Sequence, residues 1–276
     1  MTIELGVLGA HLRDHQVTPD RAAELEAAGY GTLWLDASPP ADLAVAEQLL
    51  DATARLTVGT SVVNVWTADA DTVAASYHRI AAAHPGRFLL GVGIGHREVH
   101  TGYASPYDTL VSYLDRLAAA GVPEDRIVLA ALGPRMLRLA RDRTAGTLPC
   151  MSTPEHTRRA RAILGPGKLL LPGHFAVVDP DPGRARKLAR SAPPGTALQV
   201  TNYATNLRRL GYTDDDLADA GSDRLIDALV AHGGPAAVAA GLHAHLHAGA
   251  NHVGVYPLGE DPVRTLRDVA EAVTGA

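Results

Sequence analysis

Short apolar runs alternate with longer amphipathic stretches along most of the 276-residue chain, and this alternation constrains the fold most strongly. The runs are continuously apolar, as expected for parallel strands that are covered on both faces. We expect eight strands, at residues 3–8, 32–36, 57–64, 87–93, 126–131, 148–151, 168–178 and 252–257. Repeated βα units of this kind build an α/β fold around a parallel sheet.

The stretches between the strands carry helix signals, such as Thr18 before Pro19 at a helix start and Gly29 after its end. Periodicity does not separate a closed barrel from an open doubly wound sheet, but the chain length favours a (β/α)8 TIM barrel. Residues 197–249 are interpreted as an elaborated helical connection before the last strand. Its helical segments are expected around 206–210, 223–232 and 236–246. Residues 1–276 are thus expected to form a single barrel domain.

Composition favours a soluble protein with a small-molecule partner. The chain has no apolar stretch of the length that crosses a membrane, and its first residues lack the pattern of a signal peptide. Cys150 is the only cysteine, so no internal disulfide can form, which fits a cytoplasmic location. The net charge of −5 gives no overall positive field to attract nucleic acid or an anionic membrane.

Polar residues follow the second and third predicted strands, and the carboxyl ends of barrel strands are where side chains meet a ligand. Asp36 and Ser38 offer a carboxylate and a hydroxyl after the second strand, unless one of them caps the next helix. Asn64 and Trp66 follow the third strand and suit an aromatic heterocycle. The alternative for Trp66 is ordinary core packing.

The fourth strand ends in alternating glycines, Gly91, Gly93 and Gly95, followed by His96. Such glycines leave room for a ligand against the backbone, and the imidazole beside them has a pKa suited to proton transfer. The run differs from a dinucleotide-binding loop, because no helix follows directly and His96 replaces the third glycine. The alternative for His96 is a surface loop side chain.

A turn of four residues, Leu132, Gly133, Pro134 and Arg135, joins the fifth strand to a helix. Glycine suits the turn and proline the first helical position, so the amides at the helix start, assisted by the arginine, could hold a phosphate. The alternative is an ordinary strand-to-helix turn.

The remaining candidate motifs do not indicate a metal site. His243 and His247 lie one helical turn apart without a nearby carboxylate or thiol, and His96, Glu98 and His100 lie in a loop that fixes no geometry. No metal is therefore predicted. The motifs typical of serine hydrolases and P-loop phosphotransferases are not present.

Taken in order, these segments resemble the luciferase-like monooxygenase superfamily, specifically its branch of coenzyme F420-dependent oxidoreductases. The segments are residues 35–38, 58–66, 84–96, 130–136, 152–156, 206–211 and 221–233. The resemblance implies a deazaflavin ring at the carboxyl ends of the strands, its phosphate near Gly133 and Pro134, and a homodimer. It also implies a cis peptide bond between Ser61 and Val62 beneath the ring.

The chain departs from the family where some relatives carry an Asp-His pair after the second strand. Ala37 and Ser38 stand at those positions, and Asp36 lies one step earlier. A glutamate that can follow the fourth strand is replaced by His96, which makes His96 the first candidate for proton donor or acceptor, ahead of Glu98. Asp36 is kept among the catalytic and cofactor-binding candidates.

The expected activity is hydride transfer between coenzyme F420 and an unidentified small organic substrate. One alternative on the same barrel is an FMN-dependent monooxygenase. A second is a non-catalytic flavin- or deazaflavin-binding protein, which the missing Asp-His pair favours. A zinc hydrolase that uses the histidines ranks last.

Overall fold

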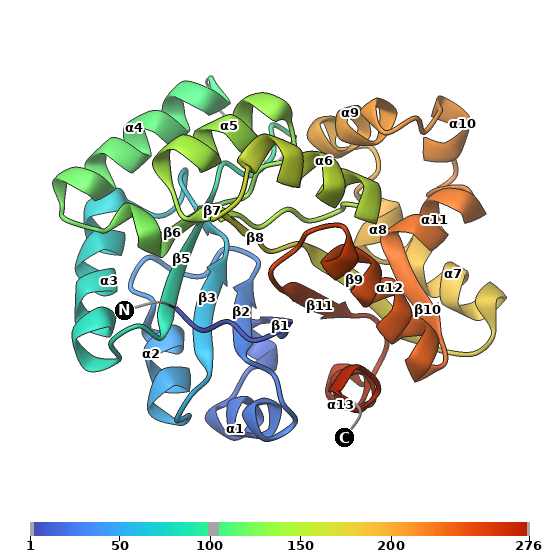
Figure 1. Ribbon diagram of the computed structural model, residues 1–276, viewed down its shortest axis with the longest axis horizontal. Coiled ribbons are helices and arrows are strands. Elements are labelled where there is room, and N and C mark those ends of the chain that lie inside the picture. Colours follow the sequence, from blue (N-terminus) through green and yellow to red (C-terminus); the bar gives the residue numbers. More distant parts are fainter. Residues whose placement is uncertain (1–2, 99–104, 275–276) are drawn as a thin grey trace.

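The computed structural model describes residues 3–98 and 105–274, and its parallel strands curl into a barrel surrounded by helices (Figure 1). The strands are β1 (Leu8–Arg13), β2 (Thr32–Asp36), β3 (Thr57–Ser61), β4 (Val63–Asn64), β5 (Phe88–Gly93), β6 (Ile127–Leu129), β7 (Gly146–Thr147), β8 (Leu169–Leu170), β9 (Gly173–Val178), β10 (Val230–Gly233) and β11 (Val253–Pro257). The α-helices are α1 (Pro19–Ala27), α2 (Ala44–Asp51), α3 (Ala70–Ala83), α4 (Pro106–Ala119), α5 (Pro134–Arg143), α6 (Pro154–Leu164), α7 (Pro182–Ser191), α8 (Pro193–Thr196), α9 (Thr201–Arg209), α10 (Asp214–Leu217), α11 (Asp223–Leu229), α12 (Pro235–His247) and α13 (Pro262–Thr274).

The sheet closes through the strand predicted at residues 168–178, which is divided into β8 and β9. β8 pairs with β7, and β9 pairs with β11, in both cases in parallel. Between them, the Leu171 amide donates to the Thr147 carbonyl and the Gly254 amide donates to the Pro172 carbonyl. The segment is therefore bonded on both sides, and the predicted α/β barrel with an elaborated connection before the last strand is confirmed.

The first strand lies at Leu8–Arg13, so its prediction at residues 3–8 was wrong. His11 and Arg13 interrupt the apolar pattern, which made the earlier run look like the strand. In the structure, Leu8 and Leu12 pack in the core outside the sheet, whereas His11 points the other way and stacks on Tyr256. A strand that is apolar on one side and carries an imidazole inside the barrel does not give a continuous apolar run.

Aromatic and imidazole rings fill the interior of the barrel, and glycines on the strands beside them supply the room. A Cβ on any of these glycines would stand within 2.4 Å of a ring atom. The pairs are Gly9 with His252, Gly59 with Trp34, Gly173 with Tyr256 and Gly254 with His11. The interior is thus packed to a density that leaves no space for one more methyl group at these positions.

The Trp34 indole fixes the protonation of His252 inside the barrel. Its Nε1 donates to His252 Nε2 over 3.0 Å, so His252 carries its own hydrogen on Nδ1, which donates to the Gly6 carbonyl over 2.9 Å. Burial lowers the pKa of His252 to about 4. This pair therefore closes the amino-terminal part of the interior with a neutral imidazole.

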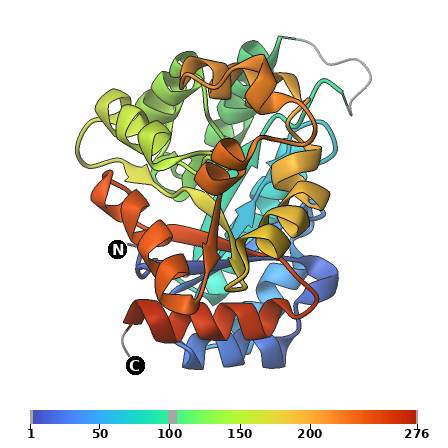
Figure 2. The same ribbon diagram turned by 90° about the vertical axis from the view of Figure 1, so that its right-hand side faces the viewer.

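In the structure the elaborated connection begins earlier than the predicted residue 197, with α7, and runs through α11 to β10, which pairs with β9. The predicted helix at 223–232 ends early, because Val230 and Ala231 pair with Phe175 and Ala176 instead of continuing the helix. A separate apolar cluster, which includes Leu198, Leu207 and Leu225, holds the connection together. In Figures 1 and 2, α9 and α10 lie at one end of the molecule, and α1 and α13 lie at the other.

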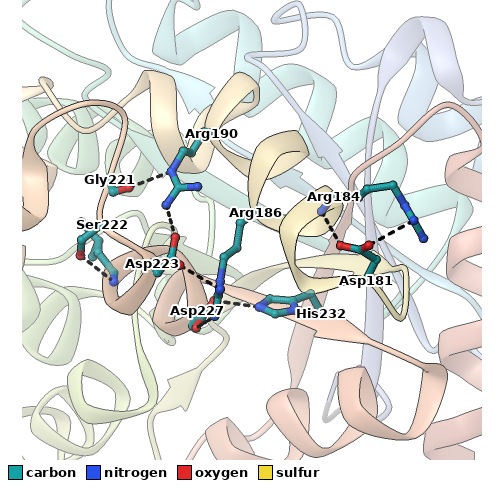
Figure 3. A network of polar contacts seen from close by, with 10 residues as sticks. Asp181, Arg184, Arg186, Arg190, Gly221, Ser222, Asp223, Asp227 and His232 are labelled. Atoms are coloured by element: carbon teal, nitrogen blue, oxygen red, sulfur yellow. Dashed lines mark hydrogen bonds and ion pairs between the residues drawn. The ribbon is translucent and has the colours of Figure 1, made fainter.

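Ion pairs fix the base of this connection. Figure 3 shows Arg186 and Arg190 of α7 reaching toward α11, where Arg186 pairs with Asp223 and Asp227 and Arg190 pairs with Asp223. His232 of β10 joins the same network through Asp227, at 2.8 Å. Several charges that share partners stabilise more than isolated surface pairs do.

None of the helices in the described ranges combines the length and apolar character that a membrane span needs.

Candidate functional site

Three polar residues lie side by side at the carboxyl ends of β1, β2 and β3. Arg13 pairs in register with Asp36, and Asp36 pairs in register with Ser61. Burial raises the pKa of the Asp36 carboxyl, opposed in part by a backbone hydrogen bond from Ala37 and by the Arg13 guanidinium. Asp36 thus keeps its proton to a higher pH than an ordinary aspartate does.

Neither predicted residue of this strand end caps the next helix. α2 begins after Leu43, and Ser38 lies exposed in the preceding turn with a φ of 61°. The capping alternative for Asp36 and Ser38 was therefore wrong. Asp36, the last residue of β2, lies at the barrel mouth, the open end of the barrel at the carboxyl ends of its strands, and Ser38 lies in the loop that follows.

Tyr256 connects the other side of the mouth to Ser61. Its hydroxyl lies 3.2 Å from Ser61 Oγ, and its ring stacks on His11 with the centroids 3.9 Å apart. Burial, together with nearby Asp36, raises the pKa of the Cys150 thiol to about 12, although a hydrogen bond from Tyr256 opposes the shift. The mouth therefore holds a neutral thiol and a neutral phenol beside the carboxyl group.

The peptide bond between Ser61 and Val62 is cis, as the resemblance predicted. The Val62 side chain packs against Gly93, where a Cβ would stand 2.4 Å from Val62 Cγ2. Gly93 therefore makes room for a protein side chain. Gly95, at the next alternate position, turns the chain with a φ of 64° toward His96.

Asn64 and Trp66 brace the backbone near the mouth. The Asn64 side chain accepts a hydrogen bond from the Trp66 amide over 3.0 Å, and the Trp66 indole donates to the Ile94 carbonyl over 2.7 Å. These contacts tie the chain after β4 to the chain after β5. The Trp66 side chain is half-buried, so its exposure does not decide between the two predicted roles, contact with a ligand and packing in the core.

His96 and Glu98 both contact α9, which covers this side of the mouth. His96 Nδ1 donates to Asn202 Oδ1 over 3.1 Å, and its ring lies 5.0 Å from that of Tyr203. Glu98 accepts hydrogen bonds from the Thr201 hydroxyl and amide, which lower its pKa to about 2. Glu98 therefore anchors the first turn of α9 as a carboxylate. The third loop residue considered for a metal, His100, lies outside the described residues.

The predicted phosphate site lies at the start of α5. Gly133 is the N-cap, Pro134 occupies the first turn, and no side chain caps the helix. The Arg135 guanidinium does not turn toward this end but lies over the Tyr107 ring, 3.8 Å from its centroid. A different cation, Arg209 at the end of α9, places Nη1 3.2 Å from the position of a Cβ on Gly133.

Leu132 completes the predicted set, and its carbonyl accepts a hydrogen bond from His156 Nε2 over 3.0 Å. The described residues contain no group of three or more His, Cys, Asp or Glu side chains that could hold a metal ion.

Sequence reasoning missed His11, Tyr203, Tyr256 and Arg209. Two of these had a readable signal. Tyr256 follows Gly254 at an alternate position of the last strand, on the inward-facing side. Arg209 lies seven residues after Asn202 on α9, on the same helical face. His11 was missed because the first strand was predicted at residues 3–8, which do not include it. Nothing in the sequence pattern placed Tyr203 at the mouth.

Comparisons with known proteins bear on the family and on the fold. The family model described as luciferase-like monooxygenase matches residues 9–117. No curated protein sequence matches the chain.

Solved structures resemble the whole chain at low sequence identity. An F420-dependent secondary alcohol dehydrogenase, solved with an F420-acetone adduct, has a TM-score of 0.76 at 15% identity, covering 98% of this chain and 99% of its own. The coenzyme F420-dependent tetrahydromethanopterin reductase of Methanopyrus kandleri has a TM-score of 0.75 at 15% identity, covering 99% of both chains.

A third similar structure contains a flavin. The oxygenating constituent of 3,6-diketocamphane monooxygenase from Pseudomonas putida, in complex with FMN, has a TM-score of 0.70 at 14% identity and covers 98% of both chains. The resemblance to the luciferase-like monooxygenase superfamily is thereby confirmed, by the family match at residues 9–117 and by a barrel fold shared along the whole chain.

Proposed function

We propose that this chain is an oxidoreductase that transfers a hydride between coenzyme F420 and a small organic substrate. The observation that carries the proposal is the pairing of two features around α9. Asp36, Ser61 and Tyr256 form a half-buried polar group at the mouth, where burial raises the pKa of Asp36, and the uncapped start of α5 lies near the other end of α9. The two similar structures named as F420-dependent support the choice of coenzyme.

The residues at the start of α5 fit a phosphorylated ring cofactor. Amides at an uncapped helix start attract an anion, and the lack of a side chain on Gly133 lets the Arg209 guanidinium lie beside them. Ser61 and Val62 would hold the ring, and Gly133 and Pro134 its phosphate. A bound reduced deazaflavin supplies the hydride, which the protein itself cannot supply.

The chain's own residues orient the reactants and move one proton. Burial raises the pKa of Asp36 at the mouth, and its neighbour Ser61 is hydrogen-bonded to Tyr256. On the other side of the mouth, the His96 ring lies beside the Tyr203 ring. Asp36 and His96 are therefore the proposed proton carriers, whereas Glu98 holds α9 in place.

Titration of the purified protein with F420 and with FMN, side by side, tests the choice of cofactor. Binding of F420 and reduction or oxidation of a member of a broad panel of hydride acceptors and alcohols would support the proposal. Tighter binding of FMN with oxygen-dependent turnover would favour the monooxygenase alternative. Binding without turnover would favour a cofactor-binding protein.

A further inference from the structure

One face of α9 carries a row of three polar side chains, which we call the α9 polar row: Asn202, Asn206 and Arg209. Their spacing of four and three residues places them within one helical face. The first member contacts His96 at the end of β5, over 3.1 Å. The last member lies above the start of α5 at Gly133. The row therefore spans the distance between the two parts of the proposed cofactor site.

The middle member of the row has a buried side-chain amide nitrogen that makes no hydrogen bond to the described residues. Asn206 is 3% exposed, and among the described residues its Nδ2 has no hydrogen-bond partner. A buried donor without an acceptor costs free energy in the folded protein. An acceptor on a bound ligand would remove that cost.

Arg209 approaches the α5 start closely only because residue 133 is a glycine. Nη1 lies 3.2 Å from the position that a Cβ would occupy, closer than most real Cβ contacts. The end of α9 is itself held, because Arg159 of α6 donates to the Arg209 carbonyl over 2.8 Å. A guanidinium is thus kept beside uncapped helix amides, where both groups attract the same anion.

α12 provides an internal comparison. It also begins with a glycine N-cap and a proline and has no side-chain cap. Nothing lies within 4 Å of the Cβ position on Gly234. The cation at α5 is therefore a separate feature and does not follow from the Gly-Pro helix start.

We propose that the α9 polar row is the second wall of a phosphate site, in which Arg209 and Asn206 bind the phosphoryl oxygens of the ring cofactor opposite the α5 amides. The proposal rests on the proposed function for the identity of the ring. It adds that the elaborated connection, and not the barrel alone, completes the site. The ligand class is a phosphate ester carried by a flat heterocycle.

Ligand pairs that differ in phosphorylation test the proposal: FMN against riboflavin, and F420 against its phosphate-free deazaflavin. Arg209→Ala should weaken binding of the phosphorylated members ~10- to 100-fold and leave the phosphate-free members unchanged. Arg208→Ala, which removes the neighbouring guanidinium paired with Asp214, should change neither. Equal loss for both members of a pair, or no loss, would overturn the proposal.

Asn206→Leu separates a binding role from a structural one. Removal of the unsatisfied amide should raise the melting temperature of the free protein while weakening the phosphorylated ligands. A lower melting temperature with unchanged affinity would count against the proposal.

If the wild type binds neither ring, the proposed function fails, and inorganic phosphate becomes the probe. A phosphate-dependent shift of the Gly133 amide resonance in wild type, absent from Arg209→Ala, would keep the phosphate site. No shift in wild type would overturn it.

Discussion

At the scale of single residues, Asp36 concentrates the chemistry of the mouth because burial raises its pKa. A raised folded-state pKa means that stability present below the ordinary value of 3.8 is lost as the pH rises through the folded-state pKa. We expect Asp36→Asn to melt at a higher temperature than the wild type at neutral pH, by ~2 to 4 °C for each kcal/mol of destabilisation that the substitution removes. Below pH 3.8 the two proteins should melt at the same temperature. Thermal melts across pH, with the exposed Asp20→Asn as control, check this; a lower melting point at neutral pH would contradict it.

His96 is the second proposed proton carrier. We expect His96→Ala to leave cofactor affinity largely intact and to lower turnover ~100-fold or more, because a positioned acid or base contributes that much. Steady-state kinetics beside a cofactor titration measure the two effects. The exposed His15→Ala is the matched control, and unchanged turnover in His96→Ala would discard the assignment.

Gly254 shows how tightly the barrel interior is packed. A methyl group there would stand 2.2 Å from His11 Nε2, so Gly254→Ala should destabilise the fold by ~1 to 3 kcal/mol. Gly234→Ala, whose Cβ meets nothing within 4 Å, should have a much smaller effect. Denaturant unfolding compares the two, and equal losses would refute the packing argument.

At the scale of elements, α9 depends on a carboxylate from a distant loop. The Glu98 pKa, lowered to about 2, means that its stabilisation is present above the ordinary value of 4.5 and is lost as the pH falls toward 2. We expect Glu98→Gln to speed hydrogen exchange at the first turn of α9 near neutral pH, with Glu260→Gln as an exposed control. Exchange equal to that of the wild type would show that Glu98 does not anchor the helix.

Elements with a clean local pattern were predictable from the sequence. β2 was placed to the residue, and Pro19 opens α1 as its capping signal indicates. β1 and β10 were not, because His11 broke the apolar run and pairing with β9 ended a helix-like stretch. For the candidate site, the strand ends indicated Asp36 and His96 as candidates, but Arg209 comes from α9, and only the folded chain places that helix over α5.

At the scale of the whole molecule, buried histidines make the fold sensitive to acid. His174 and His245 lie in contact at 3.0 Å between β9 and α12, and burial lowers both pKa values, that of His174 to about 4. Their stabilisation is present above 6.5 and is lost as the pH falls toward 4.

We therefore expect the melting temperature to fall between pH 6.5 and pH 4, with a shallower fall after paired His174→Leu and His245→Leu replacement. Calorimetry across this range measures both slopes. Equal slopes would show that other groups control acid unfolding. The prediction that residues 1–276 form a single domain can be checked in the same scans, since one cooperative transition is expected.

The attachment of α9 has a consequence for how ligand preference can change over time. The helix packs in an apolar cluster that is distinct from the main core but also includes Phe175 and Val177 of β9 and Val230 of β10. Substitutions in the α9 polar row can therefore alter which anions are accepted without replacing the apolar side chains that α9 shares with the strands. Exchanging the three residues of this row between related chains would transfer ligand preference while leaving the barrel itself unchanged.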